Sequence, residues 1–594
     1  MNLAERAGSR SLPPSAIPVF VLFLFILIAP LLALAPIGGS SEAREAQVAW
    51  VISEHGAWLL PDRNGLVASK PPLYHWMVAA LSKGLGYESV WLARVVSFGA
   101  ALLVTLITIR LVRMVMESSG VFRPLEVTQG RLLIVGVLGT LYGFQALAGV
   151  AMVDMTFALW TTLSIAVGIE PFLINFRRPM TGSSLHGPAR QFLFWLCIGF
   201  AILSKGPLGF VLPVLVVLIV GRTFVGWRVA FRSLFAPLPI LSGMLLGASW
   251  YLLVALNGQW EFLKRQLVFE NVQRFTGGAE INSEAWWFYL PEFLRAGLPW
   301  SLLFLIALGL WLRTLVVVQG GSAWISSKKP VAVGAIWFSV GLLLFSIASG
   351  KRTSYLLPLY PGMVVFLVPS LMLFWRECSG SMRAVIRRTT PFLWMAFTLF
   401  LTGCAVFGTL RGGELLSEPY RALLEPLLAS PVPWAVVLAS AVGLSVLAVV
   451  LLRGYVVGLI LSASVALLFV IQAGNTIKNS LRGFETVAEV VRALATDLSK
   501  LVVVRTRSDE LTDPVLYYLR HRVQLADPSE VASLPAGTEF LARQSTADLM
   551  EAQGMSLQVR TRFQQPGDTL RGREDRILVF AVVQNFHDVE GESS

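Results

Sequence analysis

Ionisable side chains stand at the edges of long apolar runs in this chain, where charge is expensive. Glu42 and Arg44 follow the first apolar run in "SSEAREAQVAW", and Lys70 precedes two prolines in "SKPPLYHW". Asp154 begins another apolar run in "GVAMVDMTF". Charged groups at or within such runs are costly to place in a membrane, so a functional role is the default hypothesis for them. The other polar residues in similar places are Lys205 in "LSKGP", Glu270, Asn271 and Arg274 in "FENVQRF", and Lys351 and Tyr355 in "SGKRTSYLLP".

Carboxylates and cations gathered at one membrane face could act on a lipid phosphate. Lysine and arginine would hold the phosphate through charge-assisted hydrogen bonds, and a carboxylate would take a proton from an attacking hydroxyl. Simpler explanations stay open for single residues. Asp154 suits a helix N-cap, and Lys70 suits a lysine that extends its ammonium group to the interface. The set as a whole predicts an anion site at one face.

Other kinds of chemistry lack their usual motifs. The histidines are not spaced with acids as metal ligands are, so no structural metal site is expected, although acids in the loops could recruit a divalent ion. The three cysteines are scattered, and neither a phosphate-binding glycine loop nor a G-x-S-x-G elbow is found. Most of the net charge of +12 lies in short loops between apolar runs, so no nucleic-acid partner is expected.

The elements that must position these residues are membrane helices. The chain has 594 residues, of which 55% are hydrophobic and only 14% are charged, whereas about a quarter are charged in a soluble protein. Apolar runs of bilayer-spanning length recur along most of the chain. The predicted spans, about 13 in number, lie near 17–36, 91–112, 131–148, 153–173, 191–204, 207–222, 234–255, 296–316, 331–349, 354–374, 389–409, 432–452 and 455–473.

Basic residues set the expected orientation. The loops assigned to the cytoplasm, together with the N-terminus, are richer in Arg and Lys than the others. Two long loops, 37–90 and 256–297, then lie on the outer face. The expected fold is an all-α polytopic membrane protein, with a transmembrane domain over 1–476 and a small periplasmic α/β domain over 477–594.

Local patterns predict three further details. The first outer loop should contain a helix at the membrane surface, because Val48, Val51 and Ile52 share its apolar side. The two short spans around "SKGP" should meet at a break near one membrane face. In the C-terminal domain, the pattern predicts helices at "FETVAEVVRALATDL" and "PVLYYLRHR" and strands at "LVVVR", "EFLAR", "LQVRTRF" and "RILVFAVVQ".

The first outer loop resembles that of the bacterial 4-amino-4-deoxy-L-arabinose lipid A transferases. These group with the protein O-mannosyltransferases among the polyprenyl-phosphate-dependent membrane glycosyltransferases of the GT-C type. The family pattern is Asp-Glu-x-Arg-Tyr, then "DW..P..NG", then "EKPPLYYW", and this chain has "SEAREAQVAWVISEHGAWLLPDRNGLVASKPPLYHW". Further segments match in the family's order: "LAR", "VDMTF", "LSKGPLGFVLP", "WYLLVA", "ENVQRF", "WWFYLPEFLRAGLPWSL" and "KRTSYLLPLYP".

The resemblance implies transfer of a sugar from a polyprenyl-phosphate donor to a lipid A-like glycolipid or a protein hydroxyl. The reaction would take place at the periplasmic face of the bacterial inner membrane, with inversion at the sugar carbon. It also implies roles for single residues. Glu42 and Asp154 are the candidate catalytic acids. The donor phosphate would be bound by Lys70, Arg44, Tyr355, Lys351, Lys205 and Arg274, and Tyr74, Glu270 and Asn271 would lie in the substrate cavity.

The chain departs from the family pattern at four positions. Ser41 stands where the resemblance expects the leading acid, the base of the reaction. Glu45 replaces the tyrosine after the arginine, and Ser69 replaces the glutamate before Lys-Pro-Pro. Asn271 replaces a histidine that often follows the glutamate in the second outer loop. The departures bear on the identity of the base and on any metal site of the family type.

Three outcomes remain open at this point. Glu42 serves as the base from one position along, or Asp154 serves instead. Alternatively, the protein binds the lipid phosphate without transferring the sugar, for instance as the partner of a flippase. A conventional transporter fits less well, because the charges gather at one face and no internal repeat is seen.

Overall fold

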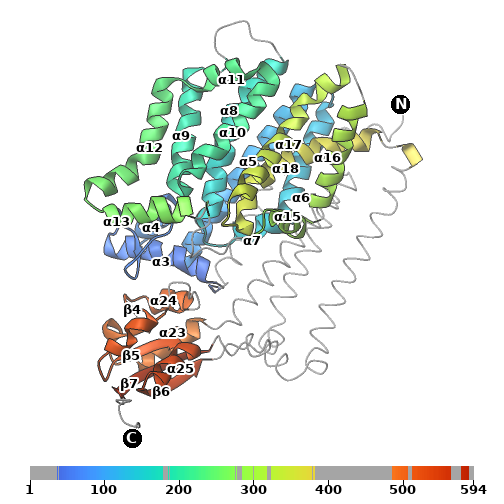
Figure 1. Ribbon diagram of the computed structural model, residues 1–594. Helices are drawn as coiled ribbons and strands as arrows, with labels where there is room; N and C mark the ends of the chain where they lie inside the picture. Colours follow the sequence, from blue (N-terminus) through green and yellow to red (C-terminus); the bar gives the residue numbers. More distant parts are fainter. Residues whose placement is uncertain are drawn as a thin grey trace.

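The structure is a computed structural model of the chain. It describes residues 36–177, 187–273, 284–317, 323–381, 484–505, 512–563 and 577–586, apart from a few single positions within them. A bundle of long helices forms the larger part, and a small sheet with its helices lies beyond one end of the bundle (Figure 1). The predicted spans near 17–36, 389–409, 432–452 and 455–473 lie outside the described residues, except for Pro36.

The bundle helices follow the apolar runs of the sequence. Six of the described helices are long and apolar enough to cross a membrane, or up to eight if two bent pairs each count as one span. A multispan helical protein is thereby confirmed, whereas the count of about thirteen spans stays a prediction. The helices are α5 Val90–Ser119, α6 Pro124–Thr140, α7 Tyr142–Ala148, α8 Val153–Arg177, α9 Pro188–Lys205, α10 Leu208–Val225, α11 Trp227–Leu234, α12 Pro237–Leu256, α15 Tyr289–Gly297, α16 Trp300–Val317, α17 Ala323–Ile347 and α18 Tyr360–Glu377.

The predicted break at "SKGP" is confirmed. Lys205 is the last residue of α9, and Pro207 comes immediately before α10. Between them Gly206 has φ of 76°, a backbone conformation that favours glycine. Since α9 packs against α8 and α4, the break holds Lys205 at the end of the bundle that faces the first outer loop.

The first outer loop folds into α3 Ser40–His55, the short strands β1 Asp62–Arg63 and β2 Leu66–Val67, and α4 Leu73–Leu85. Asn64 and Gly65 join the strands with φ of 50° and 81°, as a two-residue hairpin of the Asn-Gly type requires. Pro71 and Pro72 stop any earlier helix and lead directly into α4. The hairpin and the prolines thus fix where Arg63 and Lys70 emerge.

Helix α3 does not lie on the membrane surface with one polar side exposed, as the sequence pattern predicted. Ten of its residues are buried, including all those from Ala46 to Ser53. The reason is that α3 packs on α4 and α5 on one side and on a helix of the C-terminal domain on the other. Apolar spacing alone showed one buried side and could not reveal the second.

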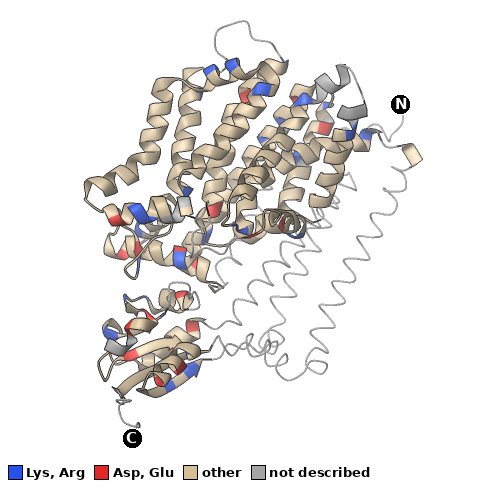
Figure 2. Ribbon diagram, viewed as in Figure 1, with Lys and Arg blue, Asp and Glu red and all other residues tan. Residues whose placement is uncertain are grey.

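The second outer loop and the turn before α18 lie at the same end of the bundle as α3 and α4. They contribute α13 Trp260–Lys264, the π-helix η1 Arg265–Gln273 and the 3₁₀-helix η2 Thr353–Leu359. Figure 2 shows charged residues gathered at the two ends of the bundle, while most of the helix length between them is uncharged. This distribution is what an apolar bilayer interior demands.

The C-terminal region forms a five-stranded sheet in the order β4-β3-β5-β7-β6. Strands β4, β3 and β5 run parallel, and β7 pairs antiparallel with β5 and β6. One face of the sheet packs on α23 and α24, and the other packs on α25. The elements are α23 Phe484–Leu494, η3 Leu498–Lys500, β3 Val502–Val504, α24 Asp513–Leu519, β4 Gln524–Ala526, η4 Pro528–Ser533, β5 Glu539–Arg543, α25 Gln544–Ala552, β6 Met555–Phe563 and β7 Leu578–Phe586.

The six elements predicted for this region are confirmed, and β4 and α25 are additional to them. Strand β4 has only three residues, which is too short to give a periodic signal. The domain boundaries at 1–476 and 477–594 stay a prediction, because the residues around 477 lie outside the described part of the chain.

Candidate active site

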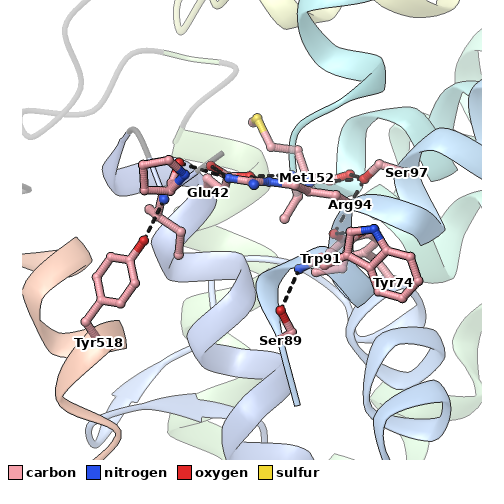
Figure 3. Close-up of polar contacts among 12 residues, drawn as sticks. Glu42, Tyr74, Ser89, Trp91, Arg94, Ser97, Met152 and Tyr518 are labelled. Atoms are coloured by element: carbon pink, nitrogen blue, oxygen red, sulfur yellow. Dashed lines mark hydrogen bonds and ion pairs between the residues drawn. The ribbon is translucent and has the colours of Figure 1, made fainter. Parts of the chain in front are cut away.

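Glu42, on the first turn of α3, forms a buried ion pair with Arg94 at the start of α5 (Figure 3). Arg94 Nε donates to Glu42 Oε1 at 2.7 Å, and Arg94 Nη2 donates to Oε2 at 3.0 Å. The backbone N–H of Ala151 donates to Oε1 at 3.1 Å. Both carboxylate oxygens of Glu42 therefore accept hydrogen bonds from the protein. The bidentate geometry fixes α3 on the bundle and favours a structural role for Glu42.

Tyr74, which was expected in a substrate cavity, lies on α4 and packs against α5. Its side chain is fully buried, and its hydroxyl donates to the backbone oxygen of Ala93 at 2.9 Å. Figure 3 shows Tyr74 beside Ser97 and close to the Glu42–Arg94 pair. Burial raises the pKa of Tyr74 above its usual range, so the phenol stays protonated.

Asp154 and Lys205 form a second buried pair. Lys205 Nζ donates to Asp154 Oδ1 at 2.5 Å, and the Ser354 hydroxyl also hydrogen-bonds Asp154. The ammonium group lies 4.4 Å from the centroid of the Tyr355 ring and 5.3 Å from that of Phe157. A cation over an aromatic face is attracted by the ring quadrupole. The start of α8, the end of α9 and η2 thus meet around one ammonium group.

Lys70, on the first outer loop, lies near enough to this pair for its charge to act on Asp154. It is half-buried on the segment before α4. Its positive charge acts on Asp154 and also on Glu45 of α3. Lys70 therefore belongs to the same group of charges as Asp154 and Lys205.

Glu45 and His75 form a contact that sequence analysis did not anticipate. His75 Nε2 lies 2.6 Å from Glu45 Oε2. The imidazole is fully buried, and its Nδ1 has no hydrogen-bond partner among the described residues. Because an ionised Glu45 oxygen can only accept, Nε2 carries a hydrogen and donates it to the carboxylate.

The environment of Glu45 favours the ionised form. Burial raises the pKa of this carboxyl, but the His75 hydrogen bond and the charges of His75, Arg44 and Lys70 outweigh burial. The pKa of Glu45 therefore falls below its ordinary range.

Arg44 points toward the C-terminal domain. Its Nη2 donates to Ser41 Oγ at 3.2 Å, and its Nε lies 3.9 Å from Asp513 Oδ2. Arg63 and Arg505 contact Asp513 Oδ1 at 3.0 Å and 2.7 Å. One fully buried carboxylate thus meets three guanidinium groups where the first outer loop joins the C-terminal domain. A role of Arg44 at the donor phosphate stays a prediction.

The remaining predicted residues have other surroundings or cannot be described. Lys351 Nζ donates to the backbone oxygens of Glu284 at 2.9 Å and Ala348 at 2.6 Å, so it braces the end of α17. Glu270 and Asn271 lie in η1, and Arg274 falls outside the described residues. In the described part of the chain, no three His, Cys, Asp or Glu side chains are grouped to hold a metal ion.

Sequence reasoning missed Arg94, the pairing of Glu45 with His75, and Ser354. Arg94 carried a usable signal, since an arginine inside an apolar run normally has a buried partner. The pairing of Glu45 with His75 carried no such signal, because the two residues are 30 positions apart and on different helices. Ser354 lies next to Tyr355 but is an ordinary serine in sequence.

Comparisons with known proteins point to one group. The chain is 27% identical over 393 residues to the undecaprenyl phosphate-alpha-4-amino-4-deoxy-L-arabinose arabinosyl transferase of Pseudomonas aeruginosa, a match that covers 64% of each chain. It is 27% identical over 356 residues to the transferase of the same name from Aeromonas hydrophila, which covers 59% of this chain and 58% of that one. The chain thus spans less than two thirds of the length of these relatives.

A solved structure shares the fold. The crystal structure of ArnT from Cupriavidus metallidurans bound to undecaprenyl phosphate superposes with a TM-score of 0.67 at 17% sequence identity, over 96% of this chain and 98% of that one. No family model matches the chain. The resemblance inferred from the first outer loop is confirmed: the homologues of this chain are arabinosyl transferases that carry undecaprenyl phosphate in their name, and its fold is that of ArnT.

Proposed function

We propose that this protein is an inverting glycosyltransferase of the inner membrane that uses a polyprenyl-phosphate sugar as its donor. The acceptor would be a hydroxyl of a lipid A-like glycolipid or of a protein, and the reaction would take place on the periplasmic side. The names of the relatives support the donor class. The excess of basic residues in the opposite loops supports the orientation.

The observation that carries the proposal is the group of charges formed by Asp154, Lys205 and Lys70. Two ammonium groups and one carboxylate lie together at the end of the bundle, with the Lys205 ammonium over the Tyr355 ring. Such a group suits a phosphodiester that becomes a monoester, and gains negative charge, as its bond to the sugar breaks. Asp154 would orient Lys205, and Ser354 would help to hold Asp154.

The surroundings of this group suit a lipid donor. It lies where membrane helices end and the outer loops begin, so a polyprenyl chain could remain in the bilayer while its phosphate reaches Lys70 and Lys205. The sugar would then be attacked from the side opposite the phosphate, which inverts its configuration.

The first test is transfer by the purified protein in lipid nanodiscs. The donor is undecaprenyl phosphate-linked 4-amino-4-deoxy-L-arabinose, and lipid A and a serine-containing peptide are offered as acceptors. Asp154→Asn should abolish transfer, because the buried Lys205 loses its counter-charge. Glu170→Gln, at the other end of α8, is the matched control and should keep full activity. Full activity of the Asp154→Asn variant would exclude Asp154 as an essential acid.

Donor binding is measured separately from transfer. Lys70→Ala should weaken donor binding by about 1.5–3 kcal/mol, the scale of one charged hydrogen bond. Lys83→Ala is the control, since Lys83 is exposed on α4 and contacts Trp58. Donor binding by the wild type without any transfer would instead favour a lipid-phosphate binder.

A further inference from the structure

We propose that Glu45, held by His75, is the general base that takes the proton from the acceptor hydroxyl. The inference rests on the proposed glycosyl transfer and assigns the one role that the transfer chemistry still lacks. Glu45 lies one helical turn after Ser41, on the same side of α3.

The geometry of the Glu45–His75 pair is that of a base with a fixed orientation. His75 Nε2–H donates to Oε2 at 2.6 Å. No hydrogen bond to Oε1 is recorded among the described residues, and the side chain of Glu45 keeps 13% of its surface exposed. One oxygen is therefore anchored, and the other is available to a substrate hydroxyl. A base must have such an oxygen within hydrogen-bond reach of the proton it takes.

Four other acids near this end of the bundle lack this arrangement. Glu42 accepts hydrogen bonds on both oxygens. Asp154 is held by a buried lysine and a serine hydroxyl. Asp513 is fully buried among three guanidinium groups, and Glu54 is exposed near the far end of α3. Among these acids, Glu45 alone combines a fixed orientation with an available oxygen.

Glu45 also lies beside the cations that would bind the donor. The charge of Lys70 acts on Glu45 and on Asp154, so one ammonium group is near both carboxylates. A phosphate held by Lys70 and Lys205 would thus have Glu45 close by. Glu45 would then take the proton, while Lys70 and Lys205 of the same group of charges would stabilise the leaving phosphate.

The electrostatics of Glu45 suit a base that is ionised throughout the working pH range. The charged and titratable groups that act on it are His75, Arg44 and Lys70, and Glu45 in turn acts on Arg63 and Tyr74. The pKa of Glu45 lies below its ordinary range mainly because His75 donates to it, against the opposing effect of burial. A weak base is sufficient, since the departing phosphate is a good leaving group.

The step balances without any further reactant. The acceptor oxygen forms the new bond to the sugar carbon while its proton moves to Glu45 Oε1. The bond from that carbon to the donor phosphate oxygen breaks, and its electron pair leaves with the polyprenyl phosphate. Lys70 and Lys205 stabilise the charge that the phosphate gains.

The decisive experiment compares Glu45→Gln with the wild type in the nanodisc transfer assay. The variant should lose about 100-fold or more in kcat, the usual contribution of a general base, with its donor affinity and unfolding midpoint unchanged. Glu54→Gln, on the same helix, is the control and should match the wild type. A folded Glu45→Gln variant with wild-type kcat would overturn the assignment.

His75→Phe is the second variant, so the result does not depend on the folding of one protein. It keeps the ring volume but removes the hydrogen bond that lowers the pKa of Glu45. The acid limb of its pH–rate profile should therefore move to higher pH, while KM for the donor stays constant. His55→Phe, at the exposed end of α3, is the control. An acid limb that does not move would show that His75 has a structural role only, and would overturn the pairing.

The two proposals fail in different ways. If the wild type transfers no sugar to any acceptor, the proposed function fails and the assignment of Glu45 fails with it. If the wild type transfers and Glu45→Gln does so equally well, the assignment of Glu45 fails alone.

Discussion

Four polar residues at the start of α3 follow one another closely in sequence but have different partners. Glu42 binds Arg94 of the bundle, Arg44 reaches Asp513 of the C-terminal domain, and Glu45 binds His75 of α4. Ser41 accepts a hydrogen bond from Arg44. Successive helix positions point about 100° apart. A short polar run can therefore bind the bundle, the C-terminal domain and α4 at once.

The partners of Glu42 predict that its loss harms stability more than chemistry. Glu42→Gln should destabilise the protein by about 3–5 kcal/mol, because the buried Arg94 loses its counter-charge. The kcat of the molecules that remain folded should stay close to the wild-type value. Thermal unfolding in detergent and transfer per folded molecule measure the two effects. Lost turnover at unchanged stability would return Glu42 to the role of base.

At the residue scale, sequence alone identified several residues that lie together but not how they pair. Asp154, Lys205, Lys70 and Tyr355 were all identified from their positions at the edges of apolar runs. Their pairing depends on which helices meet, and apolar runs do not encode that. Glu42 was one of two candidate bases because of its place next to Ser41, yet Arg94, 52 positions away, engages both its oxygens.

At the scale of elements, helix packing is closest where glycines let two backbones approach. A Cβ atom on Gly334 of α17 would meet the backbone of Phe366 and Gly362 in α18. Backbone atoms cannot move aside as the end of a flexible side chain can. The pairing of α17 with α18 therefore depends on this glycine, and α18 follows directly from the helix that carries Tyr355.

This close approach predicts a position-specific effect of alanine. Gly334→Ala should lower the unfolding midpoint and reduce donor binding, because α18 and η2 are pushed away from α17. Gly309→Ala on α16 is the matched control, since its Cβ would meet nothing within 4 Å. It should be neutral or slightly stabilising, because alanine favours the helix. Equal midpoints for both variants would contradict the packing argument.

Element positions were largely predictable from sequence, whereas their surroundings were not. The break at Gly206 and the helix after Pro71 and Pro72 followed from local chemistry. The burial of α3 on two sides did not, because the second side is covered by α24, more than 450 positions later. A local hydrophobic pattern cannot predict contacts between residues so far apart in sequence.

At the scale of the whole molecule, polar contacts hold the C-terminal domain against the first outer loop. The strongest group is Asp513 with Arg44, Arg63 and Arg505. Arg520 also contacts Glu88 at 2.9 Å, and Arg522 contacts Asp62 at 2.8 Å. The hydroxyl of Tyr518 accepts a hydrogen bond from the backbone N–H of Ile37 at 2.7 Å (Figure 3). The domain therefore borders the helix that carries Glu42 and Glu45.

Removing the shared carboxylate should loosen this contact. Asp513→Asn leaves three guanidinium groups close together without a counter-charge, so their mutual repulsion should separate the domain from the loop. Hydrogen exchange of α3 and α24 should accelerate, while that of α8 stays constant. Asp548→Asn, on the exposed side of α25, is the control. Unchanged exchange in α3 would mean that the apolar contacts suffice to hold the domain.

The position of Glu45 along α3 has a mechanical consequence. A helix of 16 residues is about 24 Å long, and the Glu42–Arg94 pair acts as a pivot near its first turn. Glu45 lies about 4.5 Å from that pivot, and the last residue lies about 20 Å away. A tilt that swings the far end by about 3 Å would therefore displace the Glu45 backbone by less than about 1 Å. A tilt of α3 about this pivot would therefore leave the Glu45 carboxylate close to its target.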